Sequence, residues 1–170
     1  MKTRNMVLCA VFAALTAICA QVVIPLGGVP VSMATLSVML CGAVLPSGTA
    51  AAAIGVYVLL GLAGTPVFAG MGAGPSVLLG VTGGYLLGYI PCAWLCAKLG
   101  RGHGWARLFA SMLCGAAVCC ICGGVWLMAV HGFTLKQALL AGIVPFVPGE
   151  ILKSVGASCL ARRIRKSLRT

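Results

Sequence analysis

The chain has 170 residues, of which 61% are hydrophobic and only 8% are charged, and its mean hydropathy is +1.13. A soluble domain of this length needs a polar shell that so few polar side chains cannot build, so one integral membrane domain is predicted. The formal net charge of +11 does not indicate a nucleic-acid-binding protein, because the basic residues gather at the chain ends and in one short gap rather than along one surface.

Six membrane-spanning helices are predicted from the breaks at glycine, proline and charged residues. They form one all-α domain over residues 1–170, with segments at Asn5–Ile24, Val31–Leu45, Thr49–Leu62, Ser76–Lys98, Arg107–Val130 and Lys136–Ala161. With the N-terminus inside, ten of the twelve basic residues fall on the inner side, as the positive-inside rule requires. Both termini are therefore expected in the cytoplasm. Five spans would put the two basic ends on opposite sides.

The first predicted helix carries two overlapping pairs of small residues. Ala10 and Ala14 form one AxxxA pair, and Ala13 and Ala17 form the other. In a bilayer, small residues four apart let helix backbones approach closely. The pairs are interpreted either as ordinary packing within the chain or as a docking face for a partner subunit.

Two stretches rich in glycine and proline interrupt the helical pattern. "PLGGVPVSMATL", residues 25–36, is predicted to lie outside as a lid, or as a plain turn between helices. "GLAGTPVFAGMGAGP", residues 61–75, cannot be a continuous helix, and irregular backbone within a membrane must line or cover a cavity. Tyr57 and Phe68 offer flat apolar faces there, and the amides of Gly70, Gly72 and Gly74 are candidates to bind an anionic or carbonyl oxygen.

Glu150 is the only acidic residue of the chain, and Lys153 follows three positions later within an apolar stretch. On a helix the two side chains share one face. An ionised group at membrane depth is costly unless it is paired or faces a polar ligand. The pair is predicted to form a substrate site, with Pro148 and Gly149 breaking the helix beside it. A purely structural ion pair is the alternative.

The chemistry of an enzyme is not indicated. There is no phosphate-binding loop, one acid cannot supply a carboxylate pair for Mg²⁺, and no catalytic triad has an orienting acid. The ten cysteines lie mostly in apolar runs, where they behave as small hydrophobic residues, and no metal site is expected.

Four motifs occur in order between about Ile24 and Lys153: "GGVPVSMATL", "GLAGTPVFAG", "TGGYLLGY" and "PFVPGEILK". Their order and spacing resemble the BioY family, the biotin-binding S components of energy-coupling factor (ECF) transporters. The resemblance implies a six-helix bundle in a prokaryotic plasma membrane that captures biotin from outside. It also implies a transmembrane T subunit and two cytoplasmic ATPases as partners. Biotin is then the transported ligand, and no cofactor is expected.

The resemblance also suggests roles for single residues. Glu150 would accept hydrogen bonds from the ureido N–H groups of biotin, and Lys153 would donate to the ureido oxygen. Charge complementarity alone favours the opposite orientation, with Lys153 on the valerate carboxylate. The other expected substrate contacts are Val29, Tyr57, Phe68, Gly70, Gly72, Gly74 and Tyr85. The alanine pairs of the first helix resemble the surface by which S components dock onto the T subunit.

The sequence also departs from the family pattern. Glu150 replaces the usual aspartate, Val81 stands where a proline is common, and Ala34 stands where a glutamine is frequent. The glycine-rich loop has no side-chain amide between Ala69 and Ser76. The alternatives are an S component for another vitamin, such as thiamine or a lipoate-like compound, a free-standing carrier of small solutes, and a structural membrane scaffold. The scaffold predicts no ligand and tolerance of Glu150→Gln.

Overall fold

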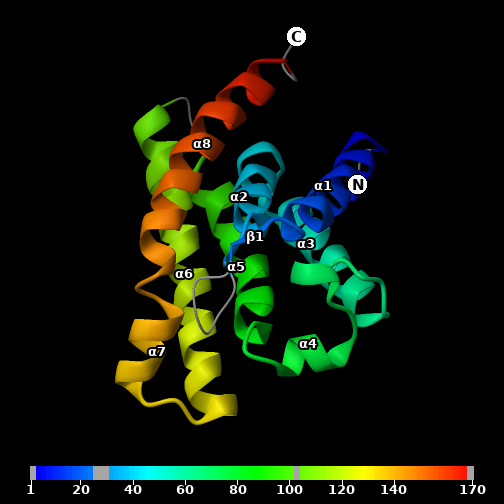
Figure 1. Ribbon diagram of the computed structural model, residues 1–170. Helices are drawn as coiled ribbons and strands as arrows, with labels where there is room; N and C mark the ends of the chain where they lie inside the picture. Colours follow the sequence, from blue (N-terminus) through cyan, green and yellow to red (C-terminus); the bar gives the residue numbers. More distant parts are fainter. Residues whose placement is uncertain (1–2, 25–30, 102–103, 168–170) are drawn as a thin grey trace.

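The computed structural model describes residues 3–24, 31–101 and 104–167, and these form a bundle of α-helices (Figure 1). The elements in chain order are α1 (Thr3–Ala20), β1 (Val23–Ile24), β2 (Val31–Ser32), α2 (Ala34–Val44), α3 (Ser47–Leu62), the 3-10 turn η1 (Ala69–Met71), α4 (Pro75–Leu79), α5 (Gly83–Leu99), α6 (Trp105–His131), α7 (Leu135–Gly142) and α8 (Phe146–Ser167). The two short strands pair antiparallel, Val23 with Ser32 and Ile24 with Val31. The predicted all-α bundle is thus confirmed.

Helix α5 lies at the centre of the bundle, where it packs against α2, α3 and α6, while α8 packs against α2 and α6. Small residues allow the close approach of α5 and α6. A Cβ atom at Gly88 would lie 3.1 Å from the Cα atom of Cys119, and one at Gly115 would lie 2.6 Å from the Sγ atom of Cys96. This is the packing that glycine permits between helices in a membrane.

Two of the six predicted segments are divided in the structure. The segment predicted at 76–98 breaks between α4 and α5, where Gly80 has extended backbone and its carbonyl accepts from the Trp126 indole N–H at 3.1 Å. The segment predicted at 136–161 becomes α7 and α8, which are bent by 43°. The break falls at residues 143–145, so the prediction that Pro148 and Gly149 break the helix was wrong. Proline is tolerated in the first turn of a helix, where its missing N–H has no partner to lose.

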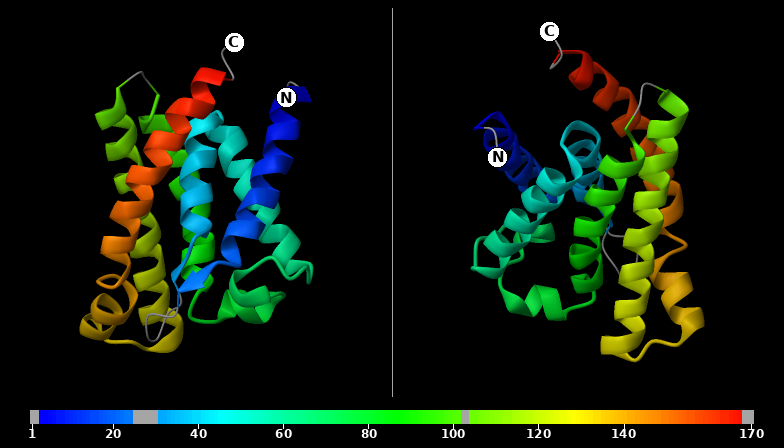
Figure 2. Two further views of the ribbon diagram at one scale, coloured as in Figure 1. Left: turned by 45° about the horizontal axis from the view of Figure 1, so that its top comes forward. Right: turned by 180° about the vertical axis from the view of Figure 1, so that it is seen from behind.

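Both termini lie at one end of the bundle, and α4, α7 and the β1–β2 pair lie at the other (Figures 1 and 2). Side chains close the first end by binding carbonyl groups at helix ends. Arg165 donates to the carbonyls of Ala43 and Gly100 at 2.6 and 3.0 Å, and Arg107 donates to the carbonyl of Leu99 at 3.1 Å. Basic side chains near helix C-termini are electrostatically favourable, so part of the basic surplus has a structural use.

Two of the described helices, α1 and α6, are long and apolar enough to cross a membrane singly, and the bent α7–α8 pair would make a third span. Helices α2 and α3 are shorter apolar helices, as predicted from their sequence. Large hydrophobic side chains are exposed along the outer helices, among them Ile18, Ile121 and Leu152. Apolar side chains on the outside suit a bundle whose solvent is lipid.

The two alanine pairs of α1 face different surroundings. Ala13 is buried and Ala17 is partly buried, beside the α1 contacts with α2 and α3, whereas Ala10 and Ala14 are exposed. Ala13 and Ala17 therefore serve packing within the chain. Ala10 and Ala14 leave a smooth outward face whose use as a docking surface stays a prediction.

Candidate ligand-binding site

A cavity of about 220 Å³ lies inside the bundle, with walls from α2, α3, α5, α6 and α8 and from the loop after α3. Its aromatic lining consists of Tyr57, Phe68, Tyr85, Tyr89 and Phe146, and its polar lining of Ser32, Thr35, Thr82, Glu150 and Lys153. The one acidic residue and all three tyrosines of the chain thus meet in this cavity. A largely apolar pocket with a few convergent polar groups is typical of a small-molecule site, and this volume lies below the usual range of roughly 300–1,000 Å³.

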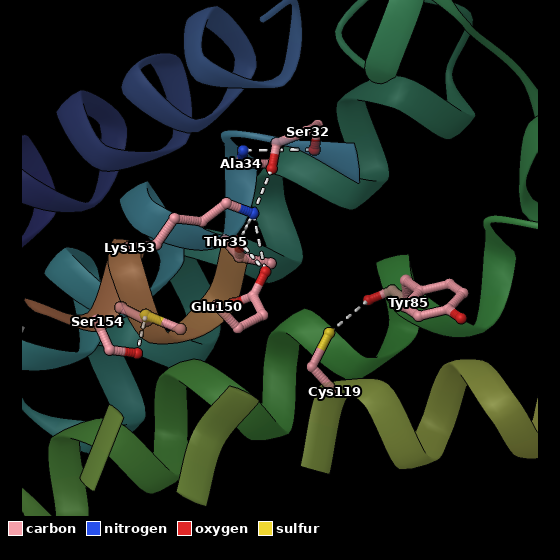
Figure 3. Close-up of polar contacts among 9 residues, drawn as sticks. Ser32, Ala34, Thr35, Tyr85, Cys119, Glu150, Lys153 and Ser154 are labelled. Carbon is pink, nitrogen blue, oxygen red and sulfur yellow. Dashed lines mark hydrogen bonds and ion pairs between the residues drawn. The ribbon is translucent and has the colours of Figure 1, made fainter. Parts of the chain in front are cut away.

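Helix α8 brings Glu150 and Lys153 together at the cavity wall (Figure 3). The Lys153 Nζ atom lies 2.8 Å from the Glu150 Oε1 atom, and Lys153 and Glu150 are only 7% and 5% exposed. Pro148 lies in the first turn of α8, so the helix runs without a break through both residues. The i, i+3 spacing then places both side chains on the face that meets α2.

The pair is part of a larger network that α2 completes. Lys153 donates to the Thr35 hydroxyl at 2.9 Å and to the backbone carbonyl of Ser32 at 2.8 Å, and the Thr35 hydroxyl donates to the Glu150 Oε1 atom at 2.8 Å. Because an ammonium group has three N–H donors, these bonds use the full donor capacity of Lys153. A charged pair at this depth is tolerated only with such additional hydrogen bonds.

The second carboxylate oxygen of Glu150 stands apart from this network. The Oε2 atom is buried and has no hydrogen-bond partner among the described residues. A buried acceptor without a partner is costly, and a charged one more so. Glu150, a lining residue of the cavity, therefore carries one strong acceptor without a described partner, while its other oxygen is held by Lys153 and Thr35.

The opposite wall is built by α3 and the glycine-rich loop. Phe68 is fully buried, and its ring meets that of Tyr57 edge to face with centroids 5.7 Å apart. Gly61 is required beneath this ring, because a Cβ atom there would overlap Phe68. Gln21, just after α1, fixes the loop by donating to the Phe68 carbonyl at 3.2 Å and accepting from the Met71 amide at 2.9 Å.

Gly70, Gly72 and Gly74 of the loop after α3 are not among the residues that line the cavity. The Gly74 amide donates to the Gly61 carbonyl at 2.8 Å, and the Gly72 amide donates to the Ala69 carbonyl at 3.4 Å. Gly70 and Gly74 have positive φ angles of 65° and 81°, a backbone region that favours glycine. These residues shape the turn that carries Phe68, and two of the three amides expected to meet a ligand already bind backbone carbonyls, one in α3 and one in the loop.

Tyr85 forms part of a third wall with the α7–α8 junction. Its ring stacks on Phe146 with centroids 5.2 Å apart, and its hydroxyl donates to the Gly142 carbonyl at 2.5 Å. Gly123 makes room for this ring, because a Cβ atom there would overlap it. Tyr85 thus offers an aromatic face to the cavity while its polar end closes the bend between α7 and α8.

Comparisons with known proteins agree with this architecture. The sequence model of the BioY family matches residues 1–170. The chain is 36% identical over 165 residues to a probable biotin transporter BioY of Pyrococcus horikoshii, covering 97% of this chain and 98% of that one. It is 35% identical over 164 residues to the biotin transporter BioY of Thermotoga maritima, covering 96% of each.

The chain belongs to the BioY family. A crystal structure of the S-component for biotin from an ECF-type ABC transporter superposes with a TM-score of 0.89 at 25% identity, covering 97% of this chain and 92% of that one. The BioY family and the S-component fold, both expected from the four motifs, are thereby confirmed. The chain is a multi-pass membrane protein, and its named relatives are transporters rather than enzymes.

For this BioY family member, the cavity gathers five of the predicted site residues: Tyr57, Phe68, Tyr85, Glu150 and Lys153. It does not gather Gly70, Gly72 and Gly74, and Val29 lies outside the described residues. Their contacts with a ligand stay predictions.

Sequence reasoning missed Ser32, Thr35, Tyr89 and Phe146 as lining residues. Thr35 and Ser32 lie within the first quoted motif, and Phe146 lies four residues before Glu150 in the last. A search for neutral partners of the buried charged pair would have drawn attention to the hydroxyl groups of the first motif.

Proposed function

We propose that this chain is a membrane-embedded biotin-binding S component that takes part in the uptake of biotin. Its relatives are named as biotin transporters, and a solved structure with the same fold is the S-component for biotin from an ECF-type ABC transporter. The observation that carries the proposal within this chain is the Glu150 Oε2 atom, a buried acceptor without a partner among the described residues, at the wall of an aromatic cavity.

The chemistry of biotin suits that wall. Its ureido ring carries two N–H donors, and a carboxylate oxygen accepts such donors more strongly than a neutral group does. The fused rings and the aliphatic tail are apolar enough to pack against the aromatic residues of the other walls. In this proposal Glu150 accepts hydrogen bonds from the ureido N–H groups, and Lys153 holds the carboxylate in position.

The role of Lys153 is thus refined from that of a direct clamp. Its three hydrogen bonds already go to Glu150, Thr35 and Ser32. To donate to the ureido oxygen, or to the valerate carboxylate, Lys153 would have to release one of them. We therefore assign it the positioning of Glu150, and its direct contact with either end of biotin stays an alternative.

The test is equilibrium binding of radiolabelled biotin by the purified chain in detergent, beside Glu150→Gln. The substitution replaces an ionic acceptor by a neutral amide of nearly the same shape, so we expect affinity to fall by roughly ten- to a hundredfold. Ser154→Ala is the control, because Ser154 lies on the same helix, donates to the Met39 Sδ atom at 3.6 Å and is outside the cavity lining. A well-folded parent that does not bind biotin would contradict the proposal and favour another vitamin or solute.

We further propose that an ECF T subunit and two ATPases energise the transport, with the N- and C-termini in the cytoplasm of a prokaryotic cell. The exposed pair Ala10 and Ala14 is the candidate docking face. Ala14→Leu should then abolish uptake in cells that hold the partners and leave binding by the purified chain intact. Uptake at parental rates by cells that lack these subunits would instead indicate a free-standing carrier.

A further inference from the structure

Tyr57 carries a second buried polar atom for which the described residues offer no partner. Its hydroxyl oxygen shares this condition with the Glu150 Oε2 atom, and both residues line the same cavity. Tyr57 is 1% exposed. Buried hydroxyl groups in native proteins nearly always have a hydrogen-bond partner, so one that has none among the described residues is a candidate to bind a ligand.

The comparison with Tyr85 shows that the fold can satisfy a tyrosine here. The Tyr85 hydroxyl donates to the Gly142 carbonyl and thereby joins α5 to the end of α7. The Tyr57 ring packs on Phe68, a contact for which a phenylalanine would serve equally well. The hydroxyl of Tyr57 therefore has no described structural use, and it belongs to a residue that lines the cavity.

The location of Tyr57 indicates which part of the ligand it meets. Tyr57 comes from α3, on the other side of the bundle from α8, which carries Glu150 (Figure 2). Among the lining residues from α3 and the loop after it, Tyr57 is the polar one, since the others are Phe68 and Ala69. The donors of Lys153 are engaged on the far wall.

A carboxylate at this depth needs a donor, because an anion without one is expensive to bury. A phenolic O–H donating to a carboxylate makes a charge-assisted bond, which is about twice as strong as a neutral one. A ligand whose N–H groups meet Glu150 on the α8 wall presents its opposite end to the α3 wall. In biotin that end is the valerate carboxylate.

We propose that Tyr57 is a specificity-determining residue, whose hydroxyl donates to the carboxylate of the ligand while Glu150 accepts from the ureido N–H groups. This rests on the proposed function. The two walls then bind the two polar ends of one molecule, and the distance between Glu150 and Tyr57 determines which ligand length fits.

The experiment is a cycle of two proteins and two ligands, which isolates one pairwise interaction. The purified parent and Tyr57→Phe are each titrated with biotin and with an analogue in which a methyl group replaces the carboxylate. We expect Tyr57→Phe to weaken biotin binding by roughly tenfold and to change the affinity for the methyl analogue by less than about twofold. The melting temperature of ligand-free Tyr57→Phe should equal or exceed that of the parent, because a buried unpaired hydroxyl has been removed.

Tyr85→Phe is the matched control. It also removes one buried hydroxyl from the lining, but a hydroxyl that is bonded to Gly142. It should lower the melting temperature and keep the parent's ratio of affinities for the two ligands.

Three results would overturn the proposal. The first is an unchanged affinity of Tyr57→Phe for biotin, and the second is an equal loss of affinity for both ligands in this variant. The third concerns the parent alone: an affinity for biotin no higher than its affinity for the methyl analogue. If the parent binds neither ligand, the proposed function itself has failed, which is a different outcome.

Discussion

Two walls of the cavity differ in the kind of interaction that holds their side chains in place. The wall formed by α8 and α2 contains the charged pair Glu150 and Lys153. The hydrogen bonds of this pair go to groups of the same wall, the Thr35 hydroxyl and the Ser32 carbonyl. The wall formed by α3 and the glycine-rich loop is apolar apart from the Tyr57 hydroxyl, and its shape comes from Phe68 packed on Gly61. One wall is fixed by electrostatics and the other by packing.

This difference indicates which wall determines the polar contacts of a ligand and which wall determines the shape of the cavity. On the polar wall the network leaves one oxygen, the buried Glu150 Oε2 atom, without a described partner, and Glu150 is a lining residue of the cavity. On the apolar wall the ring positions decide which outline fits, because interiors are packed too tightly for rings to shift at no cost. Substitutions on the polar wall should therefore lower both stability and ligand affinity. Substitutions on the apolar wall should mainly change how well the ligand fits.

The largest effect is expected from Lys153→Met. The substitution would leave the Glu150 carboxylate buried without its counter-charge, which costs about 3–5 kcal/mol when one partner of a buried pair is removed. For a chain of this size the apparent melting temperature should fall by roughly 10 °C or more. Thermal unfolding in detergent, followed by circular dichroism, measures this loss.

The double variant Glu150→Gln with Lys153→Met is the matched control for that experiment. It removes both charges at nearly constant volume, so much of the lost stability should return while biotin binding stays weak. If the double variant is as unstable as the single one, the network acts through packing rather than charge, and the contrast between the walls fails.

A medium effect is expected from Gly61→Ala on the apolar wall. The added Cβ atom would overlap the Phe68 ring and displace it, at a cost typical of overpacking, about 1–3 kcal/mol. Gly55→Ala is the control on the same helix, because nothing lies within 4 Å of a Cβ atom there. Biotin affinity should fall for Gly61→Ala only. Equal affinities for the two variants would show that the position of Phe68 does not determine the fit.

The sequence predicted the polar wall better than the apolar one, and the reason is physical. A single acid with a lysine three residues later, in an otherwise uncharged stretch, can hardly avoid forming a pair. Its hydroxyl and carbonyl partners come from residues 115 to 121 positions away, and no local pattern encodes such a separation.

The glycine-rich loop was recognised as irregular, but its use of amides was not predictable. Glycine spacing shows that the backbone must turn, whereas the partner of each amide depends on how the loop folds back on α3. The bend between α7 and α8 was misplaced for a related reason, since proline breaks a helix in its interior but is tolerated in its first turn. The distinction depends on where the helix begins, which the sequence alone does not reveal.

The smallest effect is expected from Gln21→Ala, which tests how the apolar wall is held. The variant removes the amide that binds the Phe68 carbonyl and the Met71 amide, two contacts at a partly exposed position. Each such bond contributes about 0.5–1.5 kcal/mol, so the loop should open more often and biotin should dissociate about three- to tenfold faster. Gln137→Ala, at the other glutamine of the chain, removes the capping box of α7 with Thr134, outside the cavity lining, and should leave the dissociation rate unchanged. A parental dissociation rate in Gln21→Ala would mean that the loop is held without the Gln21 amide, by the packing of Phe68 on Gly61 and by backbone bonds such as that from Gly74 to Gly61.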